Sequence, residues 1–196
     1  MAVPLVGLTG GLGAGKSTAL AQLAELGAEV LSSDEVVHEL YGTEQVARAV
    51  RDHFGDDVFE GGQVDRRALG ARAFADDADR LWLEQLLWPL VAERSAEFYE
   101  RAGRTTPTPP AAVVEVPLLF EAGAESRFAA TIAVVADDAL RALRIAGRDQ
   151  AALASREARQ LPQLEKARRA TYVVVNDGTL AELRTHLADV LEQLRR

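Results

Sequence analysis

The sequence predicts an α/β protein with a three-layer α/β/α fold, in which a five-stranded parallel core sheet is covered by helices on both faces. Short apolar runs alternate with helical segments along the chain, and strands buried on both faces of a sheet have this near-continuous apolar character. A glycine-rich stretch joins the first predicted strand to the first predicted helix. The chain has 196 residues, of which 48% are hydrophobic, so it is large enough to bury a core.

Each element has its own signal. Five apolar runs predict the strands, at residues 3–8, 29–31, 111–116, 130–135 and 171–175. Helices are predicted at residues 17–26, 35–54 with a break near Gly42, 65–74, 79–102, 138–169 and 179–194. Pro89 predicts a kink or break in its helix, and Thr179 and Glu182 have the spacing of a capping box. The proline-rich residues 105–110 cannot pair in a sheet and predict a surface loop.

The composition excludes several classes of protein. No run approaches the roughly 18 uninterrupted apolar residues of a membrane span, and the N-terminus does not have the pattern of a signal peptide. A net charge of -8 argues against broad nucleic-acid binding. The absence of cysteine excludes disulfides and a thiol nucleophile. We therefore expect a cytoplasmic protein that binds neither membranes nor nucleic acid.

The first loop carries a phosphate-binding motif. Gly10, Gly15, Lys16 and Ser17 satisfy G-x-x-x-x-G-K-[ST] between a predicted strand and a predicted helix. Glycines let backbone N–H groups turn toward phosphate oxygens, and the following helix adds its positive end. The lysine can reach the β- and γ-phosphates, and the serine hydroxyl can ligate Mg²⁺. Lysine is scarce here, since Lys166 is the only other one. The motif therefore predicts a bound nucleoside triphosphate.

Carboxylates follow two other predicted strands at the same edge, because the carboxyl ends of parallel strands lie together. Asp34 follows the second strand, where it could accept a proton from an attacking hydroxyl or cap the next helix, and the two roles are compatible. Glu115 lies near the end of the third strand. It could orient Mg²⁺ or its water, or it could be a solvated strand-end carboxylate.

A basic segment spans residues 141–169, which hold eight of the 22 basic residues. Arg144 and Arg148 are four residues apart and share a helix face, so they could close over a triphosphate and neutralise its charge. For Arg148, which lies next to Asp149 in a predicted lid, we expect a functional role. A solvated helix surface is the expectation for Arg141, Arg159, Arg168 and Arg169.

Six stretches together resemble one enzyme family. They are "LTGGLGAGKST", "VLSSDEVVHEL", "LLWPLV", "VPLLFEAG", "RALRIAGRDQ" and "QLPQLEKARRATYVVVNDG". Their order and spacing, over residues 4 to 178, are similar to those of the dephospho-coenzyme A kinases. The resemblance implies a nucleoside-monophosphate-kinase-like fold. It also implies ATP-dependent phosphorylation of the ribose 3′-hydroxyl of dephospho-CoA, the last step of coenzyme A synthesis.

The resemblance implies roles for individual residues. ATP would be held by Gly11, Gly13, Ala14, Gly15, Lys16, Ser17, Thr18, Arg144, Arg148 and Asn176, with Asn176 near the adenine. The catalytic residues would be Lys16, Asp34 and Arg148, with Asp34 as the base that faces the 3′-hydroxyl. The acceptor would be lined by Asp34, Leu118, Leu119 and Glu121. A Mg²⁺ ion would be held by Ser17 and Glu115. The chain departs from the family at Trp88, where a histidine usually precedes the proline, and at Ser32, where an acidic residue is usual.

The resemblance also implies a domain organisation. We expect a single domain of residues 1–196 whose core comprises 1–34, 105–136 and 171–196. A helical acceptor-binding insertion would occupy residues 35–104, and an arginine-rich lid would occupy residues 137–170.

The sequence also bears on three other functions. Another small-molecule kinase of the same fold remains an alternative, because fold does not determine the acceptor. A GTPase-type switch needs an N-K-x-D motif, which two lysines at 16 and 166 do not provide. A Ser-His-Asp hydrolase lacks the nucleophile-elbow motif. The three histidines, His38, His53 and His186, have no metal-binding spacing.

Overall fold

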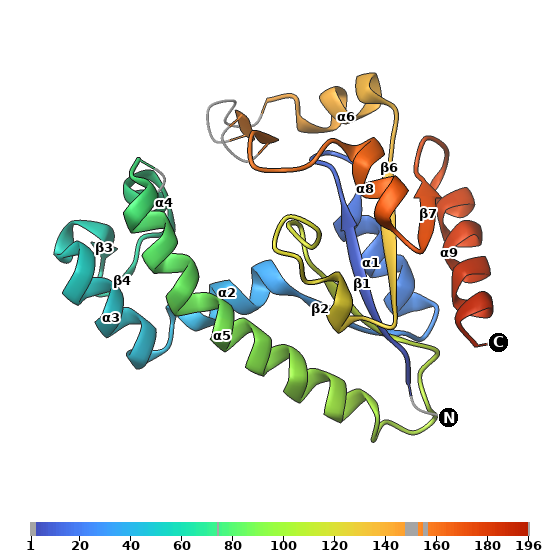
Figure 1. Ribbon diagram of the computed structural model, residues 1–196, viewed down its shortest axis with the longest axis horizontal. Helices are drawn as coiled ribbons and strands as arrows, with labels where there is room; N and C mark the ends of the chain where they lie inside the picture. The colour runs from blue at the N-terminus through green and yellow to red at the C-terminus, as the bar shows by residue number, and fades with distance from the viewer. Residues whose placement is uncertain (1–2, 74, 148–152, 155–156, 196) are drawn as a thin grey trace. The chain divides into compact units, whose positions relative to one another are not determined.

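The structure is a computed structural model, and it describes residues 3–73, 75–147, 153–154 and 157–195 (Figure 1). The chain divides into two compact units, one of residues 1–32 and 98–196 and the other of residues 33–97. The helix α5 (Asp77–Ala102) runs from the second unit into the first.

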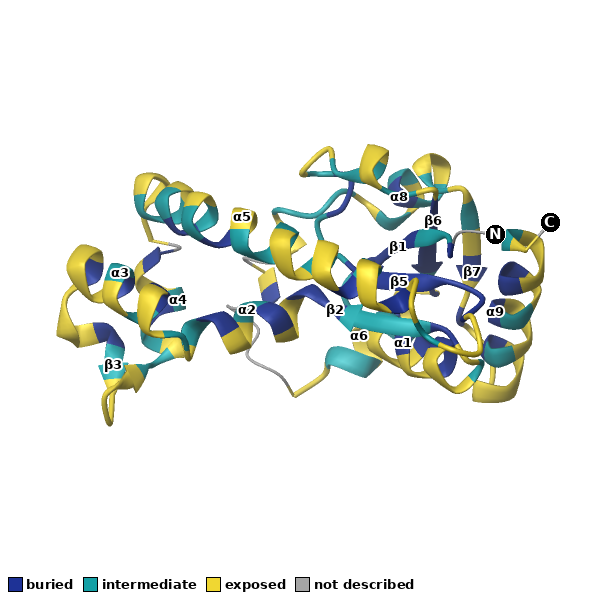
Figure 2. Ribbon diagram, turned by 90° about the horizontal axis from the view of Figure 1, so that it is seen from below, coloured by how far each residue is buried: buried dark blue, intermediate teal, exposed yellow. Residues whose placement is uncertain are grey.

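The first unit is built on a five-stranded sheet in the order β2-β5-β1-β6-β7, in which every pairing is parallel. Its strands are β1 (Leu5–Gly10), β2 (Glu29–Ser32), β5 (Ala112–Glu115), β6 (Ala130–Val135) and β7 (Tyr172–Val175). The predicted five-stranded parallel sheet is therefore confirmed. The central strands β1 and β5 are buried, as Figure 2 shows in dark blue.

Helices cover both faces of this sheet, which confirms the three-layer prediction. The helices that lie wholly in this unit are α1 (Lys16–Glu25), α6 (Asp138–Ile145), α8 (Gln163–Arg169) and α9 (Leu180–Leu194), with a 3-10 helix η2 (Glu125–Arg127). On one face, Leu8 of β1 is buried in one cluster with Leu23 of α1 and Leu187 of α9. On the other, Val114 of β5 is buried with Phe98 at the end of α5.

The second unit is mainly helical. It contains α2 (Ser33–Tyr41), α3 (Glu44–Phe54), η1 (Asp56–Val58), α4 (Arg66–Ala73) and most of α5. It also contains a hairpin of two short antiparallel strands, β3 (Phe59–Glu60) and β4 (Gln63–Val64), which the sequence analysis missed. Gly61 and Gly62 form its two-residue turn with φ of 58° and 83°, the positive angles that a tight hairpin turn requires.

Three sequence predictions need correction. Of the kink or break predicted at Pro89, the break does not occur: α5 continues through this residue, because proline removes only one of the hydrogen bonds of a 26-residue helix. The segment 138–169 is not one helical stretch: α6 ends at Ile145 and α8 begins at Gln163. In the proline-rich loop, the structure buries Pro109 and Pro110, whereas the three residues before them are exposed.

The last helix has the predicted capping box. The Thr179 hydroxyl accepts a hydrogen bond from the Glu182 N–H at 3.2 Å, and the Glu182 carboxylate accepts one from the Thr179 N–H at 2.7 Å. The Thr179 N–H and the Thr179 hydroxyl, which also donates to the Glu182 carboxylate at 2.9 Å, lower the pKa of Glu182 from its ordinary value of 4.5. The box satisfies two N–H groups that the helix itself leaves unpaired.

We predict that Thr179→Ala destabilises the fold by about 1 kcal/mol, because α9 loses its cap. Because the pKa of Glu182 is lowered in the folded state, its contribution is complete above 4.5 and is lost as the pH falls below that value. Urea denaturation at neutral and acidic pH measures both effects. The control is Thr185→Ala, since Thr185 is exposed inside the same helix and its hydroxyl donates to the Ala181 carbonyl. Equal stabilities for the two variants would contradict the prediction.

Candidate active site

The loop between β1 and α1 makes a tight turn that only glycine fits at two positions. Gly13 has a φ of 73° and Gly15 a φ of 93°, both in the left-handed region that side chains disfavour. Neighbours exclude a side chain as well: a Cβ on Gly13 would lie 2.7 Å from the Arg141 carbonyl oxygen, and one on Gly15 would overlap the Asn176 side-chain nitrogen. The turn therefore depends on close contacts with residues far along the chain.

Five successive carbonyls of this loop accept hydrogen bonds from side chains. The Lys16 Nζ donates to the carbonyls of Gly10 and Gly11, at 3.1 and 3.2 Å. The next three carbonyls accept from residues beyond position 140. Leu12 accepts from the Arg141 Nε at 2.8 Å, Gly13 from the Arg144 Nη1 at 3.5 Å, and Ala14 from the Asn176 Nδ2 at 2.8 Å.

These bonds fix the direction of the peptide N–H groups. In a planar trans peptide the N–H points opposite to the preceding carbonyl. Because the Leu12 and Ala14 carbonyls point toward Arg141 and Asn176, the N–H groups of Gly13 and Gly15 point away from those side chains. Helix α1 begins at Lys16, directly after the turn. Backbone N–H groups and a helix N-terminus at one place form a site for an anion.

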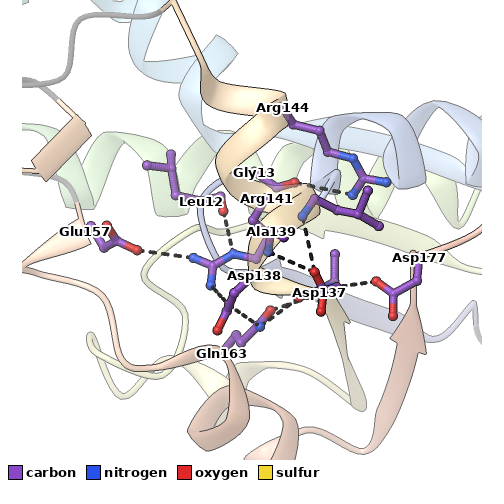
Figure 3. Close-up of polar contacts among 12 residues, drawn as sticks. Leu12, Gly13, Asp137, Asp138, Ala139, Arg141, Arg144, Glu157, Gln163 and Asp177 are labelled. Atoms are coloured by element: carbon purple, nitrogen blue, oxygen red, sulfur yellow. Dashed lines mark hydrogen bonds and ion pairs between the residues drawn. The ribbon is translucent and has the colours of Figure 1, made fainter.

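Arg141 and Arg144 lie three residues apart on α6 and both reach the loop (Figure 3). The prediction of a solvated surface is wrong for Arg141, whose side chain is only 15% exposed. The prediction holds for the exposed position of Arg169, although this side chain also pairs with Glu125 and lies over the Phe120 ring at 4.9 Å. It is confirmed for Arg168, whose side chain is 77% exposed. Arg159 is half-buried.

Asn176 connects the sheet to the loop from the end of β7. It is buried, and its N–H donates to the Val135 carbonyl at 2.8 Å. Its own carbonyl accepts from the Arg144 Nη2 at 2.9 Å, while its side chain donates to Ala14. Asn176 thus lies against the loop, and its predicted proximity to an adenine stays a prediction.

A second polar group lies on the other flank of β1. Lys166 of α8 is completely buried, and its Nζ donates to the Pro117 carbonyl at 2.6 Å and pairs with the Glu121 Oε1 at 2.9 Å. Thr9, just before the loop, donates to the same Pro117 carbonyl at 3.3 Å. Burial lowers the pKa of Lys166 from 10.5, and Glu121 opposes that shift. The ion pair therefore fixes residues 117–121 against β1 and α8.

Comparisons with known proteins identify the family. A family model described as dephospho-CoA kinase matches residues 4–182. Among curated relatives, a dephospho-CoA kinase of Protochlamydia amoebophila is 36% identical over 194 residues, covering 97% of this chain and 96% of that protein. One of Chlorobaculum tepidum is 38% identical over 201 residues, covering 97% and 94%. The chain belongs to the dephospho-CoA kinase family.

Solved structures support the same fold. The crystal structure of TT1252 from Thermus thermophilus matches with a TM-score of 0.82 and 33% identity, covering 98% of both chains. A dephospho-CoA kinase from Campylobacter jejuni matches with a TM-score of 0.66 at 21% identity, covering 99% of this chain and 98% of that one. A shikimate kinase from Acinetobacter baumannii matches at 0.51 and 18%, covering 97% and 92%, and shows the shared fold alone.

The structure describes two of the three catalytic residues that the family suggests, and these two lie in different units. Lys16 is the first residue of α1, and its ammonium lies against the loop carbonyls. Asp34 is in the second unit, exposed in the first turn of α2, and it is therefore inside the helix rather than before it. An acidic residue in that turn favours the helix dipole. Arg148 lies outside the described residues.

Apart from Asp34 in α2, the acceptor residues that the family suggests lie on the loop after β5. Leu118 is half-buried, whereas Leu119 is completely buried against Gly7 of β1. The Glu121 Oε1 accepts from the Leu161 N–H at 2.7 Å, and its Oε2 is buried without a hydrogen-bond partner among the described residues. Glu121 is thus committed to the Lys166 pair, and contact with an acceptor stays a prediction.

The remaining predicted residues lie at the same edge of the sheet. Ser17 and Thr18 are exposed in the first turn of α1. Glu115 is buried at the end of β5, in register with Leu8 of β1 and Ser32 of β2. Among the described residues, no group of three or more histidine, cysteine or acidic side chains could hold a metal ion. No described helix has the length and apolar character to cross a membrane.

Sequence reasoning missed the structural roles of Arg141 and Lys166. Each acts through a partner that is distant in the sequence, such as Leu12, which lies 129 positions from Arg141. The scarcity of lysine was the one available signal, and it pointed to Lys166 without revealing Glu121 as its partner.

We predict that Lys166→Met destabilises the fold by about 3–5 kcal/mol, because it leaves the buried Glu121 carboxylate unpaired. The double variant Lys166→Met/Glu121→Gln should recover much of this loss, since no unpaired charge then remains. Chemical denaturation measures both. The control is Arg168→Met, which removes an exposed ion pair and should cost at most about 1 kcal/mol. A double variant that is as unstable as the sum of its singles would contradict the pairing.

Proposed function

We propose that this protein transfers the γ-phosphoryl group of ATP to the ribose 3′-hydroxyl of dephospho-CoA, giving coenzyme A and ADP. Membership of the dephospho-CoA kinase family supports this reaction. The structural observation that carries it is the loop after β1, in which side chains hold five successive carbonyls and leave N–H groups directed away from them. Such a loop binds phosphate groups through its backbone.

The loop would position the nucleotide by its backbone and Lys16. The N–H groups of Gly13 and Gly15, together with the start of α1, face the phosphates. The Lys16 ammonium, which donates to the Gly10 and Gly11 carbonyls, is close enough to turn to the β- and γ-phosphates. Arg144 would neutralise charge that develops on the transferred group, and we assign Arg148 the same role from its place in the family.

A magnesium site would use oxygen ligands. The Ser17 hydroxyl and the Glu115 carboxylate are hard oxygen donors at one edge of the sheet, which suits Mg²⁺. The ion takes few protein ligands when phosphates and water fill the rest of its shell, so a large carboxylate cluster is not needed. Bound there, Mg²⁺ would supply charge neutralisation to the phosphates.

Asp34 is proposed as the general base. It would accept the proton of the 3′-hydroxyl as that oxygen attacks the γ-phosphorus, and the bond to the β-phosphate oxygen would break. Its exposed position in α2 leaves the carboxylate accessible to a ligand. Leu118 and Glu121 are proposed for the acceptor side. We place the reaction in the cytoplasm, where ATP is available.

The acceptor is tested with purified protein, ATP and Mg²⁺ against a panel of hydroxyl compounds, including dephospho-CoA, shikimate and nucleosides, with products identified by mass spectrometry. Phosphorylation of dephospho-CoA alone supports the proposal. Transfer to another acceptor in preference to dephospho-CoA would overturn it and leave a kinase of the same fold with a different substrate.

We predict that Lys16→Ala lowers phosphoryl transfer by a few hundredfold, since a charge contact of this kind supplies about 3–4 kcal/mol in the transition state. The only other lysine, Lys166, is buried in its pair with Glu121 and cannot substitute. Steady-state kinetics measures the change. A variant that keeps half of the wild-type turnover would exclude Lys16 from the reaction.

We predict that Asp34→Asn lowers kcat by roughly 10² to 10⁴, because the proton acceptor is lost. Asparagine keeps the shape of aspartate, so stability should change little. ATP affinity should stay near wild type, because the phosphates are held by the loop.

The matched control is Glu35→Gln, which removes the neighbouring carboxylate from the same exposed first turn of α2. It should leave kcat near wild type. If Asp34→Asn keeps kcat within about threefold of wild type, Asp34 is not the base.

A further inference from the structure

Arg141 joins three segments of the first unit at one guanidinium (Figure 3). Its Nε donates to the Leu12 carbonyl at 2.8 Å, its Nη1 to Asp138 at 2.7 Å, and its Nη2 to Glu157 at 3.3 Å. The three acceptors belong to the phosphate-binding loop, to α6 itself, and to the segment between α6 and α8. A planar fork of donors suits several acceptors at fixed angles.

The charge of Arg141 is already neutralised by two carboxylates, so this side chain is not presented to a phosphate. Instead its guanidinium lies against the loop backbone: a Cβ on Gly11 would be 3.2 Å from the Nη2. The Arg141 carbonyl likewise closes the space beside Gly13. The absence of side chains at these two glycines thus lets α6 approach the loop.

The start of helix α6 is held by hydrogen bonds to residues after β7 and at the start of α8. Asp137 caps it by accepting from the Ala139 N–H at 2.8 Å, and the Asp137 N–H donates to Asp177, after β7, at 2.6 Å. The Gln163 Nε2, at the start of α8, donates to the Ala136 carbonyl at 2.8 Å and to Asp138 at 3.0 Å. Arg141 therefore connects the loop to a platform that is fixed by β6, β7 and α8.

We infer that Arg141 is a positioning residue of the kinase, which holds the Leu12–Gly13 peptide so that its carbonyl points away from the nucleotide and its N–H toward the phosphates. Glycine at position 13 permits either orientation of this peptide. A carbonyl turned inward would repel phosphate oxygens. The inference rests on the proposed function, because ATP is the ligand whose phosphates the loop receives.

The test measures ATP binding by calorimetry on the full chain, with Mg²⁺, together with the KM for dephospho-CoA and the melting temperature. Arg141→Met removes the fork, and Arg141→Lys keeps the charge without the planar fork. Both should weaken ATP binding by about tenfold to a hundredfold, the usual effect of losing a charged hydrogen bond. The KM for dephospho-CoA should stay near wild type. That split, and failure of lysine to rescue, would not result from a general loss of structure.

Two control variants test whether ATP affinity depends on the bond from Arg141 to the Leu12 carbonyl. Glu157→Gln removes the carboxylate of Glu157 but leaves the bond from Arg141 to Leu12, so ATP affinity should change by less than about threefold. Arg168→Met, at an exposed arginine of α8, should change nothing.

Several outcomes would overturn the inference. These are wild-type affinity in Arg141→Met, full rescue by lysine, a loss in Glu157→Gln as large as that in Arg141→Met, or a parallel rise in the KM for dephospho-CoA. If Arg141→Met does not fold, Arg141→Lys decides. Failure of the wild-type protein itself to bind ATP would instead overturn the proposed function.

Discussion

The structure of the site depends on one constraint: the loop after β1 must keep its carbonyls turned outward, and nothing within the loop can do this for all of them. Lys16 supplies donors to the first two carbonyls, but the next three depend on Arg141, Arg144 and Asn176, which lie 129 to 162 positions away. A backbone polar group without a partner is costly when it is buried. The phosphate-binding conformation is thus a product of the whole first unit and not of the motif alone.

The strand order explains how these partners arrive. In the order β2-β5-β1-β6-β7, β1 lies between two groups of strands. Strands β6 and β7 bring Arg141 and Asn176 to one flank of the loop, because α6 and Asn176 follow their carboxyl ends. Strand β5 brings Glu115 and the Pro117 carbonyl to the other flank, where Lys166 fixes the chain. The two flanks therefore separate Arg141 and Asn176, which hold the loop, from Glu115 and the Lys166–Glu121 pair.

Local patterns made much of this predictable. The alternation of apolar runs and helices predicted the parallel sheet, and the motif at Gly10 to Ser17 predicted the phosphate site. The burial of Arg141 and Lys166 was not predictable, because a charged side chain in a basic segment looks the same whether it is solvated or paired. Only long-range packing supplies Leu12 and Glu121 as partners. The β3–β4 hairpin was missed because its strands have two residues each, although Gly61-Gly62 is a turn signal.

The two arginines of α6 have different partners and therefore different roles. Arg141 forms ion pairs with Asp138 and Glu157, and it holds the loop backbone in position. Arg144 bonds to the carbonyls of Gly13 and Asn176, and no described carboxylate forms an ion pair with it. A carbonyl that accepts a hydrogen bond carries no net charge, so the positive charge of Arg144 remains. A paired carboxylate adds a negative charge, so the field of the ion pair is weak at a distance. The charge of Arg144 would therefore still act on a phosphate bound beside the loop, while that of Arg141 would not. Three positions along one helix thus separate Arg141, which holds the loop, from Arg144, which we propose for the ligand.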